Sequence, residues 1–239
     1  MKNYTLLVLT VTLFSCSTVE VQEFNDNVLK VDENVIFLEY LEKDWQKNLN
    51  QNPLFASYVG DKRSNDKINS NSISHFIEER SSEIESLNQL YEIDQSKLTE
   101  ENQLNYKLKE FGLKSSIGLS DFPTYFLRLN QRGGIQSFYE TGNRLVYTSK
   151  EDYFDWLSRL KQFSANINNS LEINKEGLSK GITQPKIIAK GVVAQIDAIL
   201  KADIENNPYL QVFLNADESI IGVKEKNNLI EEAKVLIIN

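Results

Sequence analysis

The chain of 239 residues contains one cysteine, Cys16, and one histidine, His75. A single cysteine excludes an internal disulfide, so the fold has to be stabilised by packing. A single histidine excludes a zinc site built from several imidazoles, and no serine lies in a nucleophile-elbow pattern. Basic runs are also lacking and the formal net charge is −8, so we expect no nucleic-acid partner.

The apolar stretch at residues 6–14 is too short to span a bilayer as a helix. It follows Lys2 and ends at Ser15 and Cys16, which is typical of a secretory signal and resembles the lipobox of bacterial lipoproteins. We therefore predict a signal peptide at residues 1–15 and a lipid on Cys16, which anchors the protein to the membrane of the bacterial cell envelope. Ser17 after the cysteine favours the outer membrane, facing the periplasm. The alternative is a plain signal peptide with an incidental cysteine.

Residues 16–31 are polar and have no periodic pattern of apolar residues, as expected of a tether. In residues 32–239 the apolar residues recur with the period of a helix. No segment alternates long enough to predict a strand. The sequence thus predicts an all-α, irregular multi-helix domain.

The first three predicted helices each have an apolar stripe that we expect to be buried. The helix over residues 32–50 should bury Leu38, Leu41, Trp45 and Leu49. The second helix should bury Ile73, Ile77, Ile84, Leu87 and Tyr91. The third helix is capped by Thr99 and should bury Leu104, Leu108 and Phe111.

Residues 118–148 contain glycine and proline breaks and predict irregular structure, with a short helix at residues 135–140. A capping box at residues 149–152 predicts a long helix that ends at Gly181. A further helix follows Pro185, and a last one runs from residue 224. The buried stripes expected here are Tyr153, Trp156, Leu160 and Phe163, and then Ile188, Val192, Ile196 and Ile199.

His75 has Glu78 and Glu79 at helical spacing, so a metal site can be imagined, but a solvated surface histidine is the favoured interpretation. Residues 132–134 offer backbone amides for an anion or, more simply, form a glycine turn. Arg128 and Arg144 flank this turn and either hold a substrate carboxylate or make surface ion pairs.

Trp45 and Trp156 with nearby tyrosines either line a cleft or, as we expect, lie in the core. We assign no catalytic and no metal-binding residue in this chain.

Several landmarks occur together in the order seen in one family. The chain resembles the amino-terminal half of the bacterial domain-of-unknown-function 885 family over about residues 32–215. The matching positions are Trp45, 53–60, Leu87, Leu90, 93–94, Leu98, Tyr106, 131–134, 153–160, Glu176, Gly177, 181–185, Gln195 and 207–208.

The resemblance implies a helical lipoprotein similar to zinc metallopeptidases, with a zinc motif in a carboxy-terminal half that this sequence does not contain. Full-length relatives would hydrolyse peptides, whereas this chain would not be catalytic and would hold no cofactor. We therefore expect a truncated protein, with the apolar run at residues 235–238 exposed as an interface for the missing half. The alternative is a non-catalytic binding or structural lipoprotein of the envelope.

Overall fold

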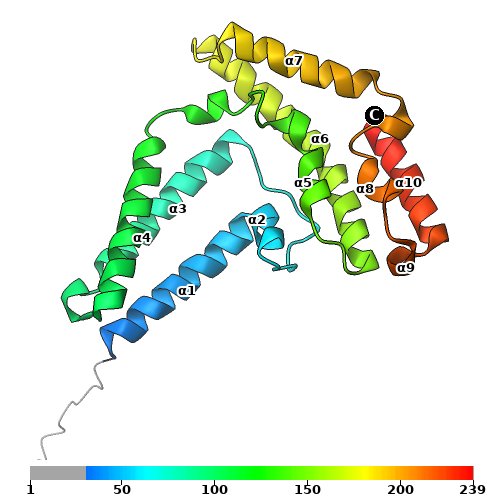
Figure 1. Cartoon of the computed structure of the whole chain (residues 1–239). Coiled ribbons are helices and arrows are strands. Elements are labelled where there is room, and N and C mark those ends of the chain that lie inside the picture. Colours follow the sequence, from blue (N-terminus) through cyan, green and yellow to red (C-terminus); the bar gives the residue numbers. More distant parts are fainter. Residues whose placement is uncertain (1–30, 239) are drawn as a thin grey trace, which may run out of the picture. The chain divides into compact units, whose positions relative to one another are not determined.

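The protein is described by a computed structural model that covers residues 31–238, so Cys16, the predicted signal at 1–15 and nearly all of the tether at 16–31 lie outside the described residues. The described part has ten α-helices and four short 3-10 helices and no β-strand, which confirms the all-α prediction (Figure 1). The α-helices are α1 Glu33–Gln51, α2 Pro53–Tyr58, α3 Ile73–Tyr91, α4 Glu100–Leu119, α5 Tyr139–Arg144, α6 Lys150–Ser179, α7 Lys186–Lys201, α8 Gln211–Leu214, α9 Glu218–Ile221 and α10 Val223–Ile238. The 3-10 helices are η1 Gln95–Lys97, η2 Thr124–Leu127, η3 Ile135–Ser137 and η4 Ile204–Asn206.

Helices α1, α3 and α4 share one hydrophobic core, and α3 and α4 pack along each other (Figure 1). Phe37 on α1 lies at its centre, 6.0 Å from the Tyr106 ring of α4. Tyr40 is buried beside it, and its hydroxyl donates to the Ser86 carbonyl at 3.0 Å. The predicted cap of α4 is confirmed, because the Thr99 side chain accepts from the backbone N–H of Asn102.

The predicted buried face of α1 is confirmed at Leu49, which is buried, and at Leu41, which packs against the core, but it is wrong at Leu38 and Trp45. Leu38 is 54% exposed and Trp45 41% exposed, whereas Phe37 and Tyr40 are buried. The helix has two overlapping apolar stripes. The stripe with Phe37 and Tyr40 packs inward, because it buries two rings and the Tyr40 hydroxyl finds a hydrogen-bond partner. Trp45 instead lies edge-on against Phe55 of α2, with ring centroids 5.7 Å apart.

The predicted stripes of α3 and α4 are also corrected. Leu104, Leu108 and Phe111 lie on the solvent side of α4. In α3 Ile77 and Tyr91 are exposed, whereas Leu87 packs against the core and Ile73 and Ile84 are half-buried, as the prediction required. α4 has apolar residues on both sides, and it packs against α3 through the side that contains Tyr106 and Leu113. Periodicity identified the helices, but it could not choose between their faces.

The second core surrounds Trp156 on α6, which is 1% exposed, as predicted. Tyr153 and Leu160 are buried with it and Phe163 packs against them, so the predicted stripe is confirmed. α6 begins with the predicted capping box at Ser149 and ends just before Gly181, whose φ of 72° suits a glycine at a helix end. Helices α8, α9 and α10 supply the rest of this core.

The stripe of α7 is confirmed, with Val192 buried and Ile188, Ile196 and Ile199 half-buried. The run at residues 235–238 of α10 is only partly exposed, as Leu236 and Ile237 pack against the Trp156 core, while Ile238 is 72% exposed. Within residues 31–238, no helix is long and apolar enough to cross a membrane.

Candidate functional site

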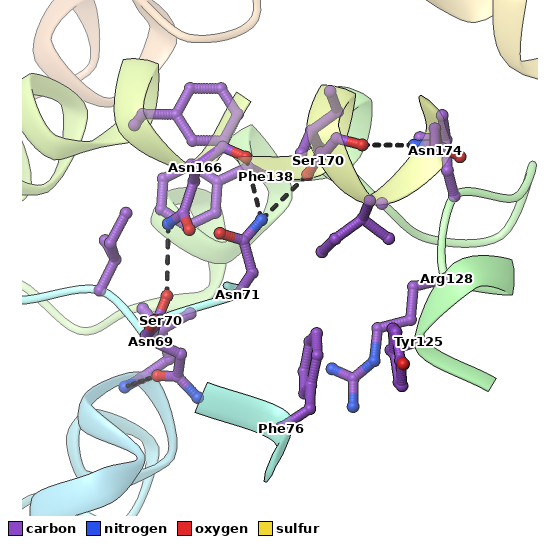
Figure 2. Close-up of a pocket in the computed structure, with 17 residues that line it drawn as sticks. Asn69, Ser70, Asn71, Phe76, Tyr125, Arg128, Phe138, Asn166, Ser170 and Asn174 are labelled. Carbon is purple, nitrogen blue, oxygen red and sulfur yellow. Dashed lines mark hydrogen bonds between the residues drawn. The ribbon is translucent and has the colours of Figure 1, made fainter. Parts of the chain in front are cut away.

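A pocket of about 300 Å³ opens between the segment before α3, η2 and the middle of α6. Figure 2 shows its polar wall, formed by asparagine and serine side chains, opposite the ring of Phe76 and the Arg128 guanidinium. The pocket thus joins residues about 100 positions apart in sequence.

Hydrogen bonds between asparagines fix the polar wall. The Asn71 amide nitrogen donates to the Asn166 carbonyl and to Ser170 Oγ, both at 2.9 Å. Its amide oxygen accepts from Asn169 at 3.1 Å, and Asn166 donates to the Asn69 carbonyl at 3.3 Å. These bonds clamp the loop before α3 onto α6, so the wall is already formed without a ligand.

Aromatic side chains form the apolar surfaces of the pocket. The Phe76 and Tyr125 rings are stacked with centroids 5.4 Å apart, and Phe138 stacks on Phe163 at 4.6 Å. Phe138 also stacks on Trp156 at 5.3 Å, so the pocket floor continues into the second core. A mainly apolar pocket with a few directed polar groups is typical of small-molecule and cofactor sites.

Arg128 is the single charged residue among the described residues that line this pocket. Its guanidinium carbon lies 4.3 Å from the Phe76 ring centroid, and no carboxylate among residues 31–238 lies within ion-pair distance of it. Arg144, the other arginine beside the glycine turn, pairs with Glu140 at 2.6 Å. The surface ion-pair interpretation therefore describes Arg144 but not Arg128.

A buried arginine on α6 supports the loop that precedes α3. The Arg159 guanidinium is fully buried and donates to the Lys67 carbonyl at 2.8 Å and to Ser57 Oγ at 2.6 Å. Burial lowers its pKa, because the charged form loses its hydration. Its Nη1 atom has no partner among the described residues, and the carbonyls of Lys67 and Pro53 together with Ser57 Oγ accept its other hydrogen bonds.

Lys62 donates to Asp152 at 2.6 Å and ties the same loop to the first turn of α6. Burial acts to raise the pKa of Asp152, but hydrogen bonds from Lys62 and from the backbone N–H groups of Thr148 and Ser149 outweigh it, so the pKa is lowered. Two cationic side chains thus hold the loop that carries the polar wall.

The remaining sequence candidates do not converge on this pocket. His75 precedes Phe76 on α3, and its ring lies 5.8 Å from that of Phe76. No group of three or more His, Cys, Asp or Glu side chains in the described part of the chain is placed to hold a metal ion, so these residues do not fit a zinc site. Trp156 is core, and Trp45 is not among the residues that line the pocket.

The turn at residues 132–134 is held by its own hydrogen bonds. The Arg132 N–H donates to Asn130 Oδ1 at 2.9 Å and the Gly133 N–H to the Asn130 carbonyl at 3.2 Å. Gly134 has a φ of 137°, which strongly favours glycine. Since two of the three amides are already used, this segment is a glycine turn and not an anion cradle.

Sequence reasoning missed Phe76 and the asparagine wall. Asn69, Asn71, Asn166 and Asn174 have no common spacing, and asparagine in a loop usually indicates only a turn. The one available signal was Arg128, which the sequence placed beside the glycine turn.

Residues 31–238 thus form an all-helical fold with a pocket whose polar wall is already hydrogen-bonded. The chain belongs to the family described as bacterial proteins of unknown function, DUF885, which matches residues 53–238 and confirms the resemblance. No curated protein matches the sequence.

A solved structure with a similar fold comes from Colwellia psychrerythraea and is described as a putative lipoprotein. The two chains share 16% identity with a TM-score of 0.69, and the match covers 86% of this chain. It covers 38% of the other chain, so this chain spans well under half the length of that protein.

Proposed function

We propose that the chain is the peptide-binding part of a lipid-anchored protein of the bacterial cell envelope, related to zinc-dependent peptidases. The observation that carries the proposal is the pocket, whose preformed polar wall of amides and hydroxyls faces stacked rings. Asn166 and Asn174 each donate one hydrogen bond within the described part of the chain and keep a second amide hydrogen for the backbone of a peptide, and the rings suit an apolar side chain. The anchor rests on Cys16, and the description of the similar solved structure as a putative lipoprotein supports it.

The described residues are proposed to bind and not to cleave. The family resemblance puts the metal motif of full-length relatives in a carboxy-terminal half, and peptide-bond hydrolysis would belong to that half. In such a protein, a pocket that holds the substrate before and during the reaction lowers the barrier by positioning. The outer membrane, facing the periplasm, is the proposed location.

The second candidate function is a binding or structural lipoprotein without any catalytic partner. It is supported by the pocket, whose lining comes entirely from residues of this chain. Both candidates share the peptide pocket, so they differ in what happens to a bound peptide and not in whether it binds.

Binding of fluorescent tetrapeptides with an aromatic residue, measured by anisotropy on the purified protein, tests the proposal. Asn174→Trp on α6 fills the pocket, and its own hydrogen bond is local, to the Ser170 carbonyl at 2.7 Å. Asn168→Trp makes the same change at an exposed position of the same helix that does not line the pocket.

We expect wild type and Asn168→Trp to bind alike and Asn174→Trp to bind at least about tenfold more weakly, the loss typical of a blocked site. Equal binding by all three proteins, or no binding by the wild type, would contradict the proposal.

A further inference from the structure

We infer that Arg128 makes the pocket selective for ligands that have a carboxylate next to an apolar side chain, and that the carboxyl terminus of a peptide is the group it binds. This inference rests on the proposed function and names the part of the peptide that the pocket holds. Nothing in the family match or in the similar solved structure assigns this role.

The first argument is the charge of the pocket. Among the described residues that line the pocket, Arg128 is the one charged residue, and its charge is positive although the whole chain has a net charge of −8. Sixteen ion pairs occupy other lysines and arginines in the described part of the chain, and none of them includes Arg128. A positive group without a carboxylate partner at the edge of an apolar pocket attracts an anionic ligand.

The second argument is that Arg128 is held in place. Its guanidinium lies over the Phe76 ring, and Phe76 is itself stacked on Tyr125. An arginine that stacks on a ring keeps its planar face against that ring and its N–H donors free at the edge, where they can form a bidentate pair with a carboxylate. A lysine at this position would not offer the same paired geometry.

The third argument is the composition of the opposite wall. Asn71 donates both of its amide hydrogens within the protein, and its amide oxygen accepts from Asn169. Asn69 likewise donates to Asn52 Oδ1 at 3.1 Å and accepts from the Leu54 N–H at 3.1 Å. These amides are therefore engaged in holding the wall, and the donors of Arg128 remain for a charged group of the ligand.

Peptides that differ in one group distinguish the sources of the carboxylate. One tetrapeptide with a carboxy-terminal phenylalanine is made as the free acid and as the amide, and a third peptide is amidated but has glutamate inside the sequence. Each is titrated against wild type, Arg128→Gln, Arg128→Lys and the control Arg132→Gln. Arg132 is also exposed and lies four residues away, but it does not line this pocket.

For wild type and Arg132→Gln we expect the free acid to bind about tenfold more tightly than the amide, the loss typical of a charge-assisted pair. In Arg128→Gln the acid and the amide should bind alike, and Arg128→Lys should retain only part of the preference. Thermal unfolding should be nearly unchanged in all variants, because both arginines are exposed.

The inference is overturned if the wild type binds acid and amide equally, or if the preference survives in Arg128→Gln. Either result leaves the proposed peptide binding intact. Tighter binding of the internal glutamate peptide than of the free acid would assign Arg128 to a side-chain carboxylate and would also overturn the inference. If none of the peptides binds, the proposed function fails together with it.

Discussion

The guanidinium carbon of Arg128 lies 4.3 Å from the centroid of the Phe76 ring, although Phe76 is on α3 and Arg128 follows η2, more than fifty positions later in the sequence. Phe76 is also stacked on Tyr125, so one ring organises both the apolar surface and the charge of the pocket. If the ring orients the guanidinium, then Phe76 contributes to anion selectivity without touching the anion.

Replacing Phe76 by leucine tests this relationship. Leucine keeps an apolar side chain but has no π face, so we expect the preference for free acid over amide to fall about three- to fivefold, as expected for a lost cation–π contact at an exposed site. Anisotropy titrations with the paired peptides measure it. The Phe55→Leu variant, whose ring packs on Trp45 outside the pocket, is the control. An unchanged preference in Phe76→Leu would show that the stack has no orienting role.

The two tryptophans should differ sharply in their contribution to stability. Trp156→Ala removes a buried ring from the second core and should cost about 3–5 kcal/mol of unfolding free energy. Trp45→Ala removes a ring that is 41% exposed and should cost about 1–2 kcal/mol, the value of a partly buried side chain. Urea denaturation compares them. Equal losses would mean that the assignment of the core is wrong.

Two glycines make a matched pair for packing. At Gly142 a Cβ atom would overlap the Trp156 ring, so Gly142→Ala should destabilise the protein by about 1–3 kcal/mol through overpacking. At Gly112, within α4, a Cβ atom meets nothing within 4 Å, so Gly112→Ala should stabilise it by up to about 1 kcal/mol. Thermal or urea unfolding of both variants measures the difference. A stabilising Gly142→Ala would contradict the close contact.

Asp152 should make stability depend on pH in the acid range. Its pKa in the folded state is lowered, so its contribution to stability is complete at neutral pH. The contribution decreases once the pH falls below the ordinary aspartate value of about 4, and is lost as the pH passes the folded-state pKa. Asp152→Asn should cost about 1–3 kcal/mol at pH 7 and flatten this dependence.

Urea unfolding between pH 7 and pH 3 provides the measurement. Asp197→Asn, which removes an exposed ion pair with Lys201, should shift stability by about 0.5 kcal/mol or less and keep the wild-type pH dependence. A wild-type pH profile in Asp152→Asn would show that other carboxylates dominate.

The class of fold and most helices could be predicted from the sequence because period, caps and breakers are local signals. Thr99, Ser149 and Gly181 act where the sequence placed them. The buried faces of α1 and α3 could be predicted only in part and that of α4 not at all, since helices with apolar residues on two sides are oriented by their neighbours. The contact between the Phe37 and Tyr106 rings, for example, joins α1 to α4 and decides which face of each helix is buried.

Less of the pocket than of the fold could be predicted from the sequence. Its wall depends on Asn71 meeting Ser170, a pair separated by 99 positions. Its charge depends on Arg128 having Phe76 as a neighbour in place of an acidic residue. Neither of these two contacts can be recognised from amino-acid composition or from residue spacing.

The proposed anchor lies outside the described residues and is tested separately. Labelled palmitate should enter the wild-type protein in a bacterial host and should not enter Cys16→Ser, because the proposed lipid attaches to this cysteine. The wild type should fractionate with membranes and the variant should not. Equal labelling of both proteins, or a mature wild type free in the periplasm, would contradict the anchor.

Photocrosslinking tests the central claim, that this pocket binds peptides, most directly. A photoreactive phenylalanine analogue replaces Tyr125, which lines the pocket, or Tyr91, which is exposed on α3 and does not line it. With a labelled free-acid tetrapeptide, the account predicts strong, saturable capture at position 125, competed by unlabelled peptide, and only background at position 91. Equal capture at the two positions, or background at position 125 in a folded protein, would contradict it.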